Sequence, residues 1–382
     1  MRPDFEKILL AAFVFLFLSF AWINNAQAVT LTPANGSTFT AANEFQSYTS
    51  SNLRASGCIG GTYTWTAASL PTGLSLSSLT GTNNTFTGSP TQSGSFTFTV
   101  TAKNSGAWLC FGGTSATYTY YITVNPRCRF SGGTTGSIAF SIDPTQAGPL
   151  YNSIVTNLSF QCGPGTTYSY TISPAQPNLT GSNNTIPYTL SAGQGLAALG
   201  QNTSDSALIP LLTTLSQVLR ADYQNAYAET DTSTETVTIS WTGAAAGSLT
   251  ATITATGIVQ NACSMSGTPA LAFGTLDAVT NAGGATATVT PPSIMCTMGG
   301  SAVVSNDGGL NYSGTPRLKD SSTNYINYNI NYTTPLTGAG GTTDIGGSGA
   351  GHLSMGATIP ASALDNAPAG TYGDTVNLTI SY

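Results

Sequence analysis

The sequence predicts an all-β protein made of several β-sandwich domains in tandem. Short runs of alternating apolar and polar residues recur along the chain, for example at 95–100, 118–124, 236–241 and 376–382, and each is bounded by Gly, Pro, Asn or Ser. The chain contains 43 glycines and 17 tyrosines, and 40% of its residues are hydrophobic. Alternation with a period of two buries one face of each strand, which is typical of sandwiches and barrels.

The segment 1–28 has the features of a secretion signal. Arg2 and Lys7 lie around the start of an apolar run at 8–23, and Ala26-Gln27-Ala28 forms a small-residue cleavage pattern. A retained membrane anchor is the alternative, but the run is short for a spanning helix. We therefore expect cleavage before Val29 and export of the mature chain.

The six cysteines of an exported chain are most simply explained by three disulfides. Pairing of nearest neighbours gives Cys58–Cys110, Cys128–Cys162 and Cys263–Cys296. Metal binding is the alternative, but no CxxC pair occurs and the single histidine, His352, lies far from every cysteine in the sequence. We expect no metal and no cofactor.

An internal repeat supports this pairing. The first copy contains Cys128, Ala139-Phe140, Asp143 and Cys162, and the second contains Cys263, Ala272-Phe273, Asp277 and Cys296. Each copy continues to an Ala-Gly dipeptide, Ala246-Gly247 or Ala369-Gly370. The apolar residues Ile253, Ala255 and Val259 follow the first dipeptide at the spacing of Val376, Leu378 and Tyr382 after the second. We therefore expect both copies to end in the same strand.

The repeat divides the mature chain into three domains of about 100 to 130 residues each. We place the boundaries near Pro126 and Val259, which gives domains at 29–126, 127–259 and 260–382. Because neither junction has a long linker, we expect the domains to sit end to end as a stiff rod.

One segment departs from the strand pattern and predicts a helix. Leu211, Leu212, Leu215, Val218 and Leu219 occur at helical spacing within 206–229, after Pro210 and with Arg220 and Asp222 on the other side. The helix could be a crossover packed on the edge of the sandwich or part of a contact surface, and the sequence leaves both open.

The charge composition argues against nucleic-acid binding and against catalysis. Only 6% of the residues are charged and the net charge is −6, so the chain has no electrostatic basis for binding nucleic acid or an anionic membrane. General acid–base chemistry needs tunable groups, and the chain has one histidine. The densest acidic stretch contains Asp205, Asp222, Glu229, Asp231 and Glu235. A solvated helix and turn account for these carboxylates, so we expect no catalytic residue and no enzyme.

The second copy of the repeat resembles the spore coat protein U domain, the pilin-type module of secreted archaic chaperone-usher pili. The resemblance covers about 120 residues and rests on Cys263, 271–277, Cys296, 325–328 and above all 369–376. The first copy departs from the pattern, because Ser141 replaces a glycine and Leu249 stands at the place of Tyr372. It resembles a divergent relative of the same domain.

The resemblance implies an immunoglobulin-like sandwich that lacks its last strand and is completed by a strand from another polypeptide. We expect the acceptor groove to be lined by Phe273, Val376, Leu378, Ile380 and Tyr382. The implied partners are a periplasmic pilus chaperone, an outer-membrane usher and a neighbouring pilin subunit, because an uncovered apolar edge would otherwise aggregate. Fibre-forming subunits of such pili carry a donor strand ahead of the pilin domain, whereas whole domains precede Cys263 here. That difference favours a position at the pilus tip, at the cell surface.

The segment 29–126 resembles a bacterial immunoglobulin-like domain through 70–76, 80–82 and 88–94. Pro71 and Gly73 form a turn there, and Gly88 and Gly94 separate strands. Such modules serve as spacers and as binding heads.

Trp108, Leu109 and Phe111 surround Cys110 in a glycine-rich turn and are the candidates for contact with a host or abiotic surface. The sequence favours a buried cluster around the disulfide over such a contact. The sequence thus predicts a tip adhesin that mediates attachment and biofilm formation, with a passive pilus or coat subunit as the alternative function.

Overall fold

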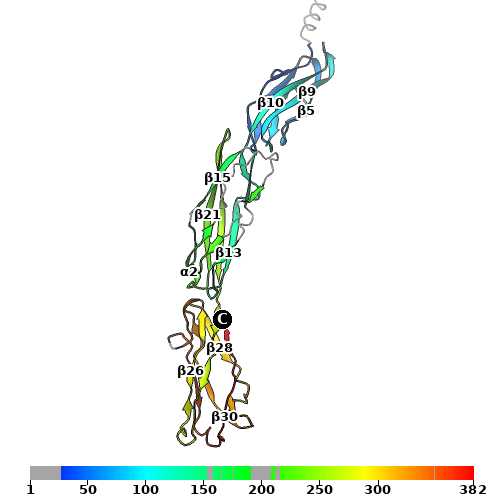
Figure 1. Cartoon of the computed structure of the whole chain (residues 1–382). Coiled ribbons are helices and arrows are strands. Elements are labelled where there is room, and N and C mark those ends of the chain that lie inside the picture. The colour runs from blue at the N-terminus through cyan, green and yellow to red at the C-terminus, as the bar shows by residue number, and fades with distance from the viewer. Residues whose placement is uncertain are drawn as a thin grey trace, which may run out of the picture.

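The computed structural model describes residues 27–152, 158–164, 166–174, 176–190, 208–210, 216–347 and 349–382. Figure 1 shows an elongated molecule in which three β-rich modules follow one another from the N-terminal to the C-terminal end. We name them the N-terminal module (27–125), the middle module (128–259) and the C-terminal module (263–382). The prediction of an all-β fold is confirmed, and no described helix is long and apolar enough to cross a membrane. Residues 1–26 of the predicted signal peptide lie outside the described residues.

The N-terminal module is a sandwich built on the long hairpin of β9 and β10. Its strands are β1 (Thr30–Thr32), β2 (Ala42–Asn43), β3 (Tyr48–Thr49), β4 (Leu53–Ser56), β5 (Ile59–Ala68), β6 (Leu74–Leu76), β7 (Asn83–Asn84), β8 (Phe86–Gly88), β9 (Gly94–Leu109) and β10 (Ser115–Asn125). One sheet has the order β2-β10-β9-β5, and two three-stranded sheets, β1-β4-β7 and β3-β8-β6, complete the module.

Aromatic side chains on alternating positions fill the core of the N-terminal module. Trp65, Phe86, Phe98 and Tyr120 are all fully buried, and Phe86 meets Phe98 edge-on with ring centroids 5.0 Å apart. The Tyr120 hydroxyl donates to the carbonyl of Pro33 at 2.9 Å. Burial raises the pKa of Tyr120 to about 12, so the hydroxyl stays a donor at any physiological pH.

The middle module contains the largest sheet of the molecule. Its elements are β11 (Cys128–Phe130), β12 (Thr135–Ile142), β13 (Leu150–Asn152), β14 (Ser159–Cys162), β15 (Thr167–Ser173), β16 (Asn178–Thr180), β17 (Thr185–Pro187), β18 (Thr189–Leu190), β19 (Leu208–Pro210), β20 (Ser216–Val218), α2 (Arg220–Tyr223), β21 (Thr230–Thr242) and β22 (Gly247–Val259). This sheet has the order β12-β22-β21-β16-β17, and β15 also pairs with β21. A single buried cluster runs through the module.

The C-terminal module has short strands and a divided core. Its strands are β23 (Cys263–Ser266), β24 (Ala270–Ala272), β25 (Ala285–Thr286), β26 (Thr288–Thr290), β27 (Ser293–Cys296), β28 (Ser301–Asn306), β29 (Arg317–Lys319), β30 (Tyr325–Asn327), β31 (Asn329–Tyr332), β32 (Leu336–Thr337), β33 (Met355–Ile359) and β34 (Leu378–Ser381). Two separate hydrophobic clusters replace the single cluster of the middle module. One is centred on Ile294 and Val304 and the other on Ile326 and Ile359.

Each module contains one disulfide, with the pairing expected from the sequence: Cys58–Cys110, Cys128–Cys162 and Cys263–Cys296. In the middle and C-terminal modules the cysteines face each other across paired strands, β11 with β14 and β23 with β27. The disulfide therefore staples equivalent strands in both copies of the repeat.

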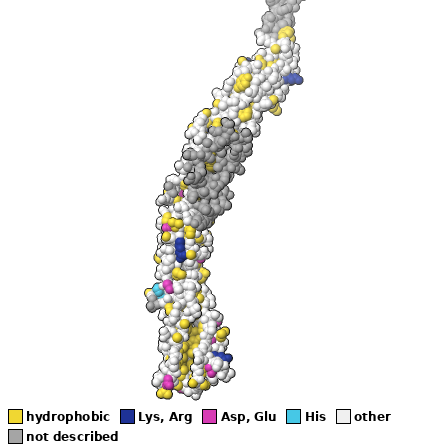
Figure 2. Space-filling model, viewed as in Figure 1, with side chains coloured by type: hydrophobic (Ala, Val, Ile, Leu, Met, Phe, Trp, Pro, Cys, Tyr) yellow, Lys and Arg dark blue, Asp and Glu magenta, His cyan; other side chains and the backbone are white. Residues whose placement is uncertain are grey.

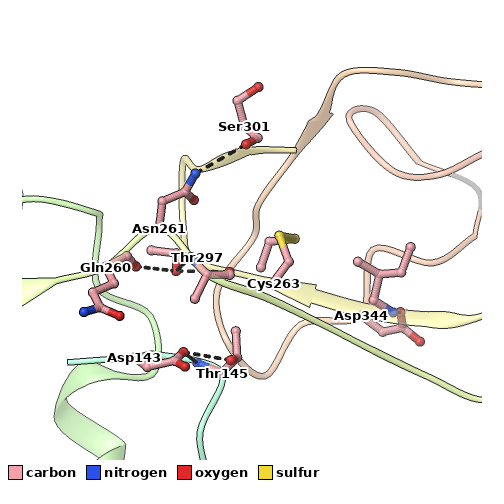
Figure 3. Close-up of a disulfide and its surroundings, with 11 residues drawn as sticks. Asp143, Thr145, Gln260, Asn261, Cys263, Thr297, Ser301 and Asp344 are labelled. Carbon is pink, nitrogen blue, oxygen red and sulfur yellow. Dashed lines mark hydrogen bonds between the residues drawn. A yellow bond between two sulfur atoms is a disulfide. The ribbon is translucent and has the colours of Figure 1, made fainter. Parts of the chain in front are cut away.

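The middle and C-terminal modules meet in a tight joint, shown in Figure 3. The Thr297 hydroxyl donates to the Gln260 carbonyl at 2.8 Å and accepts from the Ala262 amide at 3.0 Å. Tyr227 and Met298 form a parallel β-bridge across the joint, and the Gly341 amide donates to the Gln224 carbonyl at 2.6 Å. Contacts on both sides of the three-residue connection thus join the two modules at this junction.

Strand pairing corrects the predicted alignment of the repeat at its C-terminal end. β15 follows Cys162 and pairs with β21, and β28 follows Cys296 and pairs with β34. β34 is therefore the counterpart of β21, and the predicted match of 376–382 with the end of β22 is wrong. The residues agree with this, since 237–241 reads Val-Thr-Ile-Ser-Trp and 378–382 reads Leu-Thr-Ile-Ser-Tyr.

The turns that precede these strands correspond as well. The Ala226 amide donates to the Tyr223 carbonyl and the Ala367 amide donates to the Leu364 carbonyl, and both turns end inside Asn-Ala-x-Ala motifs, at 225–228 and 366–369. β22 consequently has no counterpart among the described residues of the C-terminal module.

The helix predicted over 206–229 is also wrong in its described part. The segment contains strands β19 and β20 and the short helix α2, and residues 211–215 lie outside the described residues. Val218 is buried on a strand while Leu219 is exposed, so two neighbouring apolar residues face opposite sides, as a strand requires. Apolar spacing alone could not separate a helix from short strands broken by a turn.

Candidate functional site

The clearest candidate site is the place in the C-terminal module that corresponds to β22. In the middle module, β22 lies between β21 and β12: it pairs antiparallel with β21 from Thr230↔Ile258 to Trp241↔Gly247 and parallel with β12 from Thr135↔Thr252 to Ile142↔Val259. Its inward side chains, including Ile253 and Ala255, are fully buried. β22 thus closes the middle module.

β22 covers three side chains of β21 in the middle module, and the counterparts of these side chains in the C-terminal module are partly exposed. Val237 and Ile239 are 0% exposed and Trp241 is 3% exposed. Their counterparts Leu378 and Ile380 are only half-buried, and Tyr382 is 61% exposed. β34 pairs with β28 on one side, and no described residue pairs with its other edge.

The opposite wall of this position is β24, which corresponds to β12 in the repeat. Phe140 on β12 is buried, whereas Phe273, directly after β24, is half-buried and meets Tyr328 edge-on at 6.1 Å between ring centroids. Among the described residues β24 pairs only with β26. Figure 2 shows a stripe of hydrophobic side chains along this module.

The structure places four of the five predicted groove residues against the two core clusters. Phe273 and Val376 pack against one cluster, and Leu378 and Ile380 pack against the other. Tyr382 projects into solvent. We name the position between β34 and β24 the acceptor position.

Two carboxylates hold the β34 edge in place: Asp374, which lies in the 369–376 motif, and Asp307, which the sequence reasoning did not single out. Asp374 accepts hydrogen bonds from the Tyr328 hydroxyl at 3.0 Å and from the Asn311 side chain at 3.1 Å. Burial raises the pKa of Tyr328, and its bond to Asp374 raises it further. Asp307 accepts from the amide and the side chain of Asn377 at 3.0 and 2.6 Å. These bonds fix the backbone next to the β34 edge.

A second candidate lies beside the Cys58–Cys110 disulfide in the N-terminal module. Trp108 is 66% exposed and Phe111 is 46% exposed, while Leu109 is half-buried. The Trp108 ring lies against Gly60, where a Cβ would come within 2.6 Å of it. Two of the three candidate contact residues thus have exposed aromatic rings, and the expectation of a buried cluster is wrong for Trp108 and Phe111. Trp65, Tyr63 and Tyr120, by contrast, are buried in the core.

The acidic stretch differs from its prediction as a solvated helix and turn. Asp231 and Glu235 are completely buried on β21, and Asp205 lies outside the described residues. Glu229 accepts the amides of Asn183 and Asn184 at 2.8 and 2.9 Å. Glu229 and Asp231 organise the turn at 181–184, which the alternation of β21 alone did not reveal.

The fold and the uncovered edge of β34 define the class of protein: an all-β chain whose last module is a pilin-type sandwich. Residues 249–379 match the family model of the Spore Coat Protein U domain, and residues 25–125 match that of the Putative Ig domain. The chain therefore carries a spore coat protein U domain and an N-terminal immunoglobulin-like domain. The first match supports the class of chaperone-usher pilus subunits.

Several solved structures are distantly similar to the chain. The chain is 14% identical to a chain of the CsuC–CsuE chaperone–tip adhesion subunit pre-assembly complex from archaic chaperone-usher Csu pili of Acinetobacter baumannii, over 67% of this chain and 100% of that chain, with a TM-score of 0.40. For the human Desmocollin-1 ectodomain the identity is 11%, over 94% and 57% of the two chains, with a TM-score of 0.29. For Drosophila N-cadherin EC1-4 the identity is 13%, over 62% of this chain and 50% of that chain, with a TM-score of 0.28. No curated protein matches the chain.

Proposed function

We propose that this protein is the tip adhesin subunit of an archaic chaperone-usher pilus and is assembled by donor-strand complementation. The observation that carries the proposal is the loss of cover on β34 relative to β21. Buried counterparts in the middle module become half-buried or exposed in the C-terminal module, so a further strand would restore their cover. A periplasmic chaperone would supply that strand first, and a neighbouring pilin subunit would supply it in the fibre.

The position of β22 supports a place at the tip. β22 lies directly ahead of Cys263, where a donor strand would be expected, but β21 and β12 hold it along its whole length. Withdrawing it would expose the core of the middle module, so it is not free to complete another subunit. The N-terminal module lies at the opposite end of the rod from the C-terminal module in Figure 1, which suits a distal contact region at the cell surface.

A closing strand placed directly after Tyr382 tests the acceptor position. We expect a chain extended by a second copy of residues 242–259 to be a soluble monomer, because Tyr382 corresponds to Trp241 and the added strand would lie as β22 does. Amide hydrogen exchange of β34 should slow by at least about tenfold, since both edges of the strand would then be paired.

The matched control carries Asp in place of the added copies of Ile253 and Ala255. It has the same length and turn but puts charges on the face that must be buried, so the exchange of β34 should stay as fast as in the unextended chain. Unchanged exchange of β34 in the extended chain would remove the proposal of an incomplete module.

The exposed rings beside the first disulfide give a prediction for adhesion. We expect the double variant Trp108→Ser, Phe111→Ser to lose at least about tenfold in binding to hydrophobic surfaces, because exposed aromatic groups supply most of the contact energy of such sites. The thermal unfolding midpoint should change little, since both rings are solvated.

Tyr121→Ser is the matched control, because Tyr121 is also an exposed aromatic residue of the N-terminal module. It should bind as the parent does. Full retention of binding by the double variant would favour a passive structural subunit.

A further inference from the structure

The closing strand of the middle module has the sequence position of an element of the C-terminal module. Only Gln260, Asn261 and Ala262 separate the end of β22 from Cys263. The match to the Spore Coat Protein U domain begins at residue 249, inside β22, and then continues through the C-terminal module. β22 therefore folds as part of the middle module, although the family match includes most of it in the domain that forms the C-terminal module.

Without β22, the two modules have equivalent strand sets. β21 and β34 are the last strands of their modules by pairing, and both follow the equivalent turns at 223–226 and 364–367. The middle module would then have an open position between β21 and β12, like that between β34 and β24. What distinguishes the two modules is that a strand leading into the next module fills the first position.

We propose that residues 127–382 are two pilin-type subunits fused in one chain, with β22 as the donor strand of the second subunit. The joint between the middle and C-terminal modules is then an internal copy of the subunit contact in the fibre. This inference rests on the proposed function and specifies its partner: a subunit with a strand like β22 that is followed, about three residues later, by its own first cysteine.

The joint also predicts the surface on which that partner sits. Across the joint, Gln224, Asn225 and Tyr227 contact the C-terminal module: the Gly341 amide bonds to Gln224, Asn225 lies against Gly340, and Tyr227 bridges to Met298. Their counterparts in the C-terminal module are Asp365, Asn366 and Pro368, and all three are exposed. This surface should receive loops of the next subunit equivalent to 297–299 and 338–341.

A cross-link in a lengthened chain tests the geometry. The full chain is extended after Tyr382 by residues 242–382 and then by 242–259, so that a second C-terminal module follows the first and its own acceptor position is closed. Pro368→Cys in the first C-terminal module and Met298→Cys in the added one should form a disulfide. β-Bridge partners lie about 5 Å apart, within disulfide reach. Tyr227→Cys with Met298→Cys across the native joint is the positive control.

The expected result is that both pairs cross-link with yields that agree within about twofold, as read from disulfide-linked peptides by mass spectrometry. If the control pair forms and the Pro368 pair does not, the fused-subunit geometry is wrong. That outcome is distinct from failure of the proposed function, in which exchange of β34 does not slow in the chain extended by residues 242–259 alone.

Discussion

Replacing Ile239 with Asp should unfold the middle module, whereas the same change at its counterpart Ile380 should be tolerated in the free chain. Ile239 is completely buried between β15 and β22. An uncompensated carboxylate there costs several kcal/mol, a large part of the roughly 5 to 15 kcal/mol that stabilise a domain. Ile380 is half-buried on the open edge, so Ile380→Asp should cost only about 1 kcal/mol.

Urea unfolding of the two variants, with amide exchange read separately on β21 and β34, measures this difference. Ile380→Asp should also abolish the protection that an added strand gives, because the carboxylate would have to be buried beneath it. Equal losses of stability at the two positions would show that β34 is as well covered as β21, and the acceptor position would then have no physical basis.

Much of this architecture could be predicted because it follows from local rules. Alternating residues identified strands such as β10 and β21, and nearest-neighbour pairing with the repeat identified the disulfides, which join equivalent strands. These features depend on residues close in sequence or on one repeated spacing.

The correct alignment of the repeat depended on strand pairing and was missed. β22 and the segment 370–382 share an apolar spacing, and any two half-buried strands share it, because the period of two carries no information about partners. The decisive signal was residue identity: Thr-Ile-Ser followed by an aromatic residue at 238–241 and 379–382, after Asn-Ala-x-Ala at 225–228 and 366–369. That signal aligns 378–382 with β21, so β22 is the strand that has no counterpart among the described residues of the C-terminal module.

The buried carboxylates of β21 were missed for a related reason. The pattern of β21 alternates correctly, but its inward positions near the joint are the polar residues Asp231, Ser233 and Glu235. Glu235 is bonded by the nearby Ser233, but the partner of Asp231 is the sequence-distant Asn184. No local rule predicts that a strand buries a carboxylate whose partner comes from a distant turn.

Replacing Asp231 with Asn should stabilise the middle module at neutral pH. One oxygen of the completely buried Asp231 accepts the Asn184 side chain at 2.9 Å, and the other has no hydrogen-bond partner. That second oxygen and Oε1 of Glu229 both face Gly181, at 2.0 and 2.6 Å from the place a Cβ would occupy. Burial raises the pKa of Asp231, the Asn184 bond opposes the rise, and the nearby Glu229 carboxylate adds to it. An Asn amide would present a donor toward Glu229 with no charge to bury.

The sign of the pH dependence follows from proton binding. Because the folded pKa of Asp231 lies above its unfolded value of about 3.9, the folded module binds more protons in the interval between them. Its free energy of unfolding therefore falls as the pH rises through that interval. The stabilising contribution is fully present below about pH 4 and is lost as the pH passes the raised folded value. Glu229 acts in the opposite sense, because the Asn183 amide and its neighbours lower its pKa.

Asp231→Asn should thus gain about 1 to 3 kcal/mol at pH 8, the usual cost of an unsatisfied buried polar group, and should gain nothing near pH 3. Hydrogen exchange of β21 amides at several pH values reports this module separately from its neighbours. Asp222→Asn, on the half-exposed helix α2, should change the free energy of unfolding at neither pH.

The Asn184 side chain also donates to the Tyr227 carbonyl at 2.9 Å, and Tyr227 bridges to the C-terminal module. Above the folded pKa of Asp231, the loss of protection from hydrogen exchange should therefore extend from the turn at 181–184 to the joint. Protection that does not depend on pH at either place would show that Asp231 is already ionised in the folded chain.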